Sequence, residues 1–169
     1  GRIAETDLWA LNDRLRPKPA QLLAVLPRVF ATVHAHGIAA VHDVTSAEML
    51  RALQMARDAG IPPVRVSCSV PTDQLDALRT AGVQCGFGDE YLRILGIKIF
   101  VDGSLGARTA FLRQPYSDAP TTSGTAFHTS AGLATLVETA DAAGLQLMIH
   151  AIGDAALDRV LDCVGDKFA

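Results

Sequence analysis

The sequence predicts an α/β protein built on a parallel sheet, and two observations lead to this prediction. Segments that alternate like strands follow segments with apolar residues at helical spacing, in a regular order along most of the chain. Glycines and prolines separate these segments where one element ends and the next begins. Because right-handed crossovers join parallel strands, the carboxyl ends of all the strands are expected on one side of the sheet.

The first predicted elements are helices followed by a strand. Residues 1–17 are weakly patterned apart from a short predicted helix over 7–15. Apolar residues at helical spacing predict a longer helix over 19–36, which Gly37 ends. A strand over 38–44 follows.

Two further units repeat this order. Ser46 is the predicted N-cap of a helix that ends at Gly60, because a serine hydroxyl accepts a hydrogen bond from the first helical turn. A strand over 64–70 comes next, and a shorter helix is predicted over 72–81.

The next predicted strand, over 95–102, carries the first residue that needs a functional explanation. Its apolar face consists of β-branched side chains, Ile97, Ile99 and Val101. Lys98 lies on the other face. A lysine in a protein interior is costly unless its charge is paired, neutralised or used chemically, so Lys98 is a candidate functional residue.

A long segment without regular structure is predicted over 103–129, after this strand. Long loops inside compact domains are often active-site or binding loops, so we expect an active-site loop here. Arg108, Thr109 and Tyr116 are the polar residues in it that we expect to contact a substrate. The alternative is an exposed loop with solvated side chains.

The chain then completes the pattern with a helix over 130–144, a strand over 145–149 that ends at His150, and a last helix. Asp154 is the predicted N-cap of that helix. Since ligands bind beyond the carboxyl ends of parallel strands, these strand ends predict one shared site. It would collect His42 from the first strand, Lys98 and Asp102 from the third, and His150 from the fourth; Asp43, which alternates with His42, would instead cap the following turn.

Length and composition limit the classes of protein that this chain can belong to. At 169 residues with 49% hydrophobic content, it is long enough for one domain with a core, and too short for a complete eight-stranded βα barrel of about 250 residues. The net charge of -3 and the scattered basic residues predict no nucleic-acid partner and no membrane surface.

The cysteines and the N-terminus predict the cellular setting. The three cysteines are an odd number without CxxC spacing, so we expect no disulfide framework or zinc knuckle, and a cytoplasmic location. No signal segment opens the chain and no apolar run is long enough to span a bilayer. Because the first residue is Gly1 rather than Met, we expect a piece of a longer protein.

Three motifs resemble the amidohydrolase superfamily, and in particular its deformylase-like branch of N-substituted formamide deformylases and related metal-dependent hydrolases. They are GIAAVHDV, GIKIFVDGSLGARTAFLRQPYSD and GLQLMIHAIGDAALDRVLD. The resemblance implies a (β/α)8 TIM-type barrel, of which residues 1–169 would be a single partial piece with roughly strands two to five and their helices.

The resemblance also implies a metal centre and a reaction. Lys98 would be carboxylated by carbon dioxide and would bridge two divalent metals, expected to be zinc, and His150 would bind one of them. Lys98 and His150 are thus both the metal-binding and the catalytic residues, with Arg108, Tyr116 and His42 as substrate-binding residues. A metal-bound hydroxide would hydrolyse an amide, formamide or other C–N bond in a small molecule.

The sequence departs from the family pattern in several ligands. The HxH motif of barrel strand one, the histidine of strand six and the aspartate of strand eight have no counterparts here. His34 and His36 spell HAH, but they fall late in a predicted helix. We therefore expect the piece alone to be inactive. Its open barrel edges would favour a homo-oligomer or association with another chain segment.

Other interpretations remain open. Lys98 could extend to water or pair with Asp102, or it could form a Schiff base as in aldolases and related lyases. His150 could be a hydrogen-bonded core histidine. The whole chain could be a truncated barrel module without catalytic activity.

Overall fold

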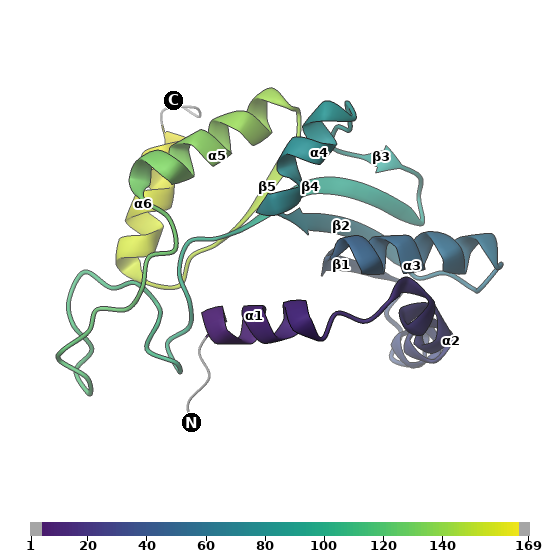
Figure 1. Ribbon diagram of the computed structural model, residues 1–169, viewed down its shortest axis with the longest axis horizontal. Coiled ribbons are helices and arrows are strands. Elements are labelled where there is room, and N and C mark those ends of the chain that lie inside the picture. Colours follow the sequence, from purple (N-terminus) through teal and green to yellow (C-terminus); the bar gives the residue numbers. More distant parts are fainter. Residues whose placement is uncertain (1–4, 166–169) are drawn as a thin grey trace.

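The structure, a computed structural model, describes residues 5–165 and is organised around a curved parallel sheet. Within these residues four strands run parallel and lie side by side in chain order: β1 (Ala40–Val44), β2 (Arg65–Pro71), β4 (Leu92–Phe100) and β5 (Gln146–His150). They curl into a half-barrel (Figure 1). The prediction of an α/β fold that forms part of a TIM-type barrel is confirmed.

The helices cover the convex side of this sheet in two groups, each with its own core. Helices α2 (Pro19–Ala35) and α3 (Ala47–Asp58) pack against β1 and β2. Helices α5 (Ser130–Ala142) and α6 (Asp154–Val164) pack against β4 and β5. None of the described helices is long and apolar enough to cross a membrane.

The remaining helical segments are shorter. Helix α1 (Glu5–Arg14) confirms the short helix predicted near the N-terminus, and it lies across the open side of the half-barrel (Figure 1). The predicted helix after β2 forms as a 3-10 turn, η1 (Thr72–Gln74), that continues into α4 (Leu75–Thr80).

The burial of side chains along β4 confirms the predicted alternation of its two faces. Ile97, Ile99 and Val101 are completely buried in the core that α5 and α6 cover, whereas Lys98 is half-buried on the opposite face. The predicted cap of α3 is also confirmed, because the Ser46 side chain accepts a hydrogen bond from the Met49 N–H at 3.2 Å.

The prediction that Asp154 is the N-cap of the last helix is wrong. Gly153 is the N-cap, and Asp154 is the first helical residue. The reason is that Asp154 accepts a hydrogen bond from the Arg113 N–H at 2.9 Å, so its carboxylate joins the long loop to the helix.

A short strand, β3 (Phe87–Gly88), was not predicted. It pairs antiparallel with the first part of β4, so the sheet is not purely parallel. The turn between them is stabilised by Asp89, whose carboxylate accepts the N–H groups of Tyr91 and Leu92 at 2.9 and 3.0 Å. A two-residue strand carries too little alternation to be recognised from sequence.

The contact between β4 and β5 leaves no room for a side chain at Gly96. A Cβ atom there would lie 1.8 Å from the carbonyl oxygen of Gln146, in the neighbouring strand's backbone. We expect Gly96→Ala in the full-length protein to cost on the order of 1–3 kcal/mol or more, because backbone must move to admit the methyl group. Thermal unfolding should show a clearly lower Tm.

Gly106→Ala is the matched control for this prediction, because a Cβ at Gly106 meets nothing within 4 Å. An equal change in Tm for the two variants would contradict the prediction.

Candidate active site on the inner face of the half-barrel

The register of β4 and β5 places the two principal candidates on one face. Lys98 is paired with Met148, and Phe100 is paired with His150. Paired residues in neighbouring strands project to the same side of a sheet, and residues two apart in a strand share a face. Lys98, Phe100 and His150 therefore all lie on the inner face, near the carboxyl ends of adjacent strands.

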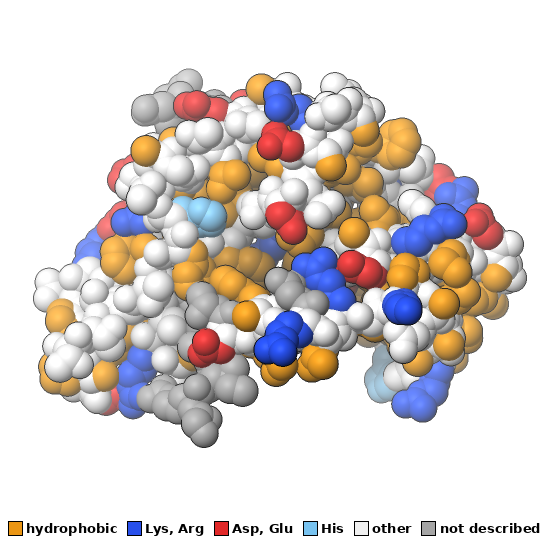
Figure 2. Space-filling view, in the orientation of Figure 1, with side chains coloured by type: hydrophobic (Ala, Val, Ile, Leu, Met, Phe, Trp, Pro, Cys, Tyr) orange, Lys and Arg blue, Asp and Glu red, His pale blue; other side chains and the backbone are white. Residues whose placement is uncertain are grey.

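A hollow of about 540 Å³ lies in front of Lys98. Trp9 from α1 forms part of its wall, with its ring centroid 5.8 Å from that of Phe100 and 5.1 Å from that of Phe127. His128 also lines the hollow. Hydrophobic side chains gather in the hollow seen in the middle of the space-filling view (Figure 2). An apolar wall of this kind partly screens Lys98 from water.

This environment disfavours the charged form of Lys98 relative to a lysine in water. Burial lowers the pKa of its ammonium group, because the charged form loses hydration in the half-buried hollow. The Nζ atom lies 4.7 Å from the centroid of the Phe100 ring, an arrangement that attracts a cation and offsets part of this effect. A lysine whose charge is disfavoured is suited to chemistry that requires a free amine.

The His150 ring is oriented by the end of the neighbouring strand. Its Nε2 atom lies 3.0 Å from the Gly103 carbonyl oxygen. A carbonyl can only accept a hydrogen bond, so Nε2 must carry the hydrogen and, in the neutral ring, Nδ1 keeps its lone pair. The Nδ1 lone pair of His150 is therefore available to a metal. Histidine ligands are commonly oriented in this way, with the other ring nitrogen hydrogen-bonded to a carbonyl.

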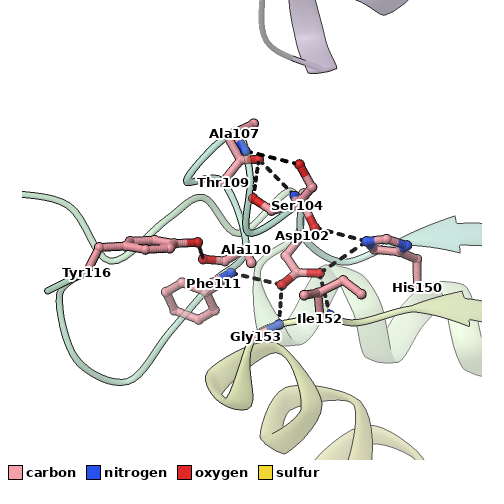
Figure 3. Close-up of polar contacts among 11 residues, drawn as sticks. Asp102, Ser104, Ala107, Thr109, Ala110, Phe111, Tyr116, His150, Ile152 and Gly153 are labelled. Carbon is pink, nitrogen blue, oxygen red and sulfur yellow. Dashed lines mark hydrogen bonds and ion pairs between the residues drawn. The ribbon is translucent and has the colours of Figure 1, made fainter. Parts of the chain in front are cut away.

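Asp102 is completely buried beside this ring, and its carboxylate binds backbone rather than Lys98 (Figure 3). It accepts hydrogen bonds from the N–H groups of Phe111 at 2.8 Å, Ile152 at 3.0 Å and Gly153 at 2.8 Å. The pairing of Lys98 with Asp102 considered from the sequence does not form within residues 5–165.

The structure separates His42 from the hollow around Lys98. His42 lies on the inner face and pairs with Ser67 of β2, which in turn pairs with Arg93 of β4. Arg93 comes five residues before Lys98, which is roughly 15 Å along β4. His42 lines a different hollow of about 230 Å³. Asp43 alternates with it, as predicted, and accepts a hydrogen bond from the Thr45 hydroxyl at 2.7 Å.

The loop over 103–129 lacks regular structure, as predicted, but its polar residues are bound to one another. Arg108 donates to both carboxylate oxygens of Asp118, with the shortest contact at 2.8 Å. The Tyr116 hydroxyl donates to the Ala110 carbonyl at 2.8 Å, and burial raises the pKa of this tyrosine. Roles for Arg108 and Tyr116 in substrate binding stay predictions.

Sequence reasoning missed Trp9 and His128 as residues that line the Lys98 hollow. The only signal for Trp9 was that it is the single tryptophan of the chain. Burial lowers the pKa of His128, opposed by a hydrogen bond to the Phe100 backbone, so its imidazole is biased toward the neutral form. His34 and His36 lie at the end of α2 and outside this site, as expected.

The donors present can supply only part of a metal site. Within residues 5–165, no group of three or more His, Cys, Asp or Glu side chains could hold a metal ion. Lys98 and His150 nevertheless fit such a site, because they share one face. His150 offers a ring nitrogen, and Lys98 would offer oxygen donors after carboxylation. A complete metal site built on these two residues would need further ligands from outside the described residues.

Parallel strands that follow one another in chain order, with helices on the convex side and polar residues at the strand ends, define a βα-barrel protein. The chain belongs to the amidohydrolase family, whose family model matches residues 1–166. The deformylase-like branch within that family remains a prediction.

Known relatives agree with this assignment. YtcJ of Bacillus subtilis (strain 168), an amidohydrolase by name, is 42% identical over 74 residues, which are 44% of this chain and 14% of YtcJ. A solved structure described as an uncharacterized metal-dependent hydrolase from Pyrococcus furiosus matches 95% of this chain with a TM-score of 0.84 and 30% identity. Another so described, from Pyrococcus horikoshii OT3, matches 96% with a TM-score of 0.85 and 33% identity.

The chain covers only part of the length of these proteins. It covers 34% of each of the two Pyrococcus chains, as well as the 14% of YtcJ.

Proposed function

We propose that this chain forms roughly strands two to five of the barrel of a metal-dependent amidohydrolase. The reaction is the hydrolysis of an amide, formamide or other non-peptide C–N bond in a small molecule. The observation that carries the proposal is that Lys98 and His150 share the inner face at adjacent strand ends, with burial lowering the pKa of Lys98. Family membership and the metal-dependent hydrolases of similar fold support it.

Lys98 acts after reaction with carbon dioxide. Its neutral amine forms an N–C bond to the carbon of CO2 and loses one proton to solvent, which leaves an anionic carbamate. This reaction requires the uncharged amine, which burial makes easier to reach because it lowers the pKa of the Lys98 ammonium group. The carbamate replaces a cation that is costly to bury with oxygen donors for divalent metal.

His150 donates Nδ1 as a second ligand from this chain, while the Gly103 carbonyl holds its Nε2 atom. Divalent metal bound there, which we propose to be one or two zinc ions, supplies an acidified water and a polarised substrate carbonyl. The aromatic residues beside Lys98, including Trp9 and Phe127, partly screen the reacting groups from bulk water.

We also propose that further protein closes the half-barrel, either the rest of a longer chain or a second copy. Within the described residues β1 pairs only with β2, and β5 pairs only with β4, so each presents an open edge. Open edges of a parallel sheet favour such association. The cytoplasm is the proposed location.

The test uses the full-length protein, prepared with bicarbonate and zinc, and measures bound metal together with hydrolysis of a panel of N-formyl and N-acyl compounds. We expect one or two metals per chain and hydrolysis of at least one class. Borohydride added with carbonyl compounds should trap no adduct on Lys98. A trapped adduct would favour a Schiff-base lyase, and absence of both metal and activity would favour a non-catalytic barrel module.

A further inference from the structure

The junction around Asp102 joins the two strands that carry the proposed ligands. The N–H groups bound by its carboxylate come from two segments far apart in the sequence, one in the long loop at Phe111 and one after β5 at Ile152 and Gly153. A carboxylate is suited to this position because it only accepts hydrogen bonds, and all three partners only donate. The group is completely buried, so water cannot replace these bonds.

The same short stretch of chain also holds His150 from both sides. Val101, which precedes Asp102, donates its N–H to the His150 carbonyl at 3.0 Å. Gly103, which follows Asp102, contacts the ring nitrogen Nε2 at 3.0 Å through its carbonyl. Asp102 Oδ1 itself lies 3.7 Å from Nε2 (Figure 3). Three consecutive residues thus contact His150 or the turn directly after it.

We propose that Asp102 is a positioning residue for His150: it binds the turn after β5 to the end of β4 and so sets where the His150 ring lies relative to Lys98. The inference rests on the proposed function, in which His150 is a metal ligand. The carboxylate of Asp102 is occupied by backbone N–H groups, so its proposed role is indirect. It acts through the backbone of Ile152 and Gly153 and through the Gly103 carbonyl.

The test compares Asp102→Asn with Asp89→Asn in the full-length protein. Asparagine keeps the size of the side chain but turns an NH2 group toward buried N–H donors, so at least one of the three hydrogen bonds is lost and donors oppose each other. Asp89 provides the control because its carboxylate also accepts two backbone N–H groups, both at Oδ1, in the β3–β4 turn away from the site, while its Oδ2 pairs with Arg57.

The quantity measured is the zinc dissociation constant, obtained by competition with a chromogenic chelator at a temperature where each variant is folded. We expect Asp102→Asn to bind zinc about 10–100-fold more weakly, the usual loss when a partner of a ligand is removed, and Asp89→Asn to bind like wild type. A role confined to stability would lower the Tm of Asp102→Asn and leave its zinc affinity unchanged, which would overturn the inference.

Two further measurements separate this inference from the proposed function. In one outcome, wild type binds zinc and His150→Ala weakens this binding while Asp102→Asn does not; then only the inference fails. In the other outcome, wild type binds no zinc, and the proposed function fails. If Asp102→Asn does not fold, hydrogen exchange on wild type decides. Zinc should slow exchange of the Ile152 and Gly153 amides more than that of the Tyr91 and Leu92 amides, and equal effects would contradict the inference.

Discussion

Lys98→Ala in the full-length protein is expected to lose at least about 100-fold in kcat/KM, together with most of its bound metal. The reason is that alanine removes the proposed carbamate ligand. Loss of a residue that only orients a metal ligand already lowers metal affinity or activity about 10–100-fold, so loss of a ligand should cost at least as much. The measurements are metal analysis of the purified variant and hydrolysis of the best compound in the panel. A short carboxylate such as acetate should restore part of both, because it fits the vacated space and offers the same oxygen donors.

Arg93→Ala is the control for this experiment. Arg93 is another cation on β4, but it lines the hollow of His42 and donates to the Ser67 hydroxyl at 3.1 Å. It should keep its metal and its activity. If Lys98→Ala keeps the full metal content, Lys98 is not a ligand, and the Schiff-base and non-catalytic interpretations gain support.

Ile99→Ala should cause a large loss of stability while leaving the inner face untouched. Ile99 is completely buried on the outer face of β4, in the core that contains Leu133 and Val137 of α5. Removing most of its side chain costs about 2–5 kcal/mol, because the lost burial is combined with a cavity that close packing cannot refill. Thermal unfolding of the full-length protein should show a markedly lower Tm.

The graded control is Ile99→Val, which removes one methylene and should cost about 0.5–1.5 kcal/mol. Zinc affinity of folded Ile99→Val should match wild type, since the side chain points away from Lys98. A Tm for Ile99→Ala equal to that of Ile99→Val would show that this core relaxes around the cavity or that β4 is not packed as described.

The secondary structure was largely predictable because its signals are local. The alternation in β4, the serine cap at Ser46 and the glycine stops at Gly37 and Gly60 each depend on residues a few positions apart. The same locality explains the failures. β3 is too short to show a period, and Asp154 was assigned as a cap without knowledge of the Arg113 N–H that approaches it from the loop.

The candidate site was predictable only in part. Lys98 and His150 could be placed on one edge because they end parallel strands, and the structure brings them to one face. His42 shares that face but lies in a different hollow. The sequence could not show this, because strand register cannot be obtained from alternation alone. Trp9 reaches the hollow from α1, a helix whose place beside the sheet no local pattern indicates.

The sequence by itself determined the order of the elements, the buried face of β4 and the strand-end positions of Lys98 and His150. Those properties follow from side-chain periodicity within each segment. Only the tertiary structure decided that Asp102 joins two distant turns, that Tyr116 is buried in its own loop, and that Trp9 lines the hollow in front of Lys98. Such contacts depend on register and loop path, which bring together residues that no local pattern relates.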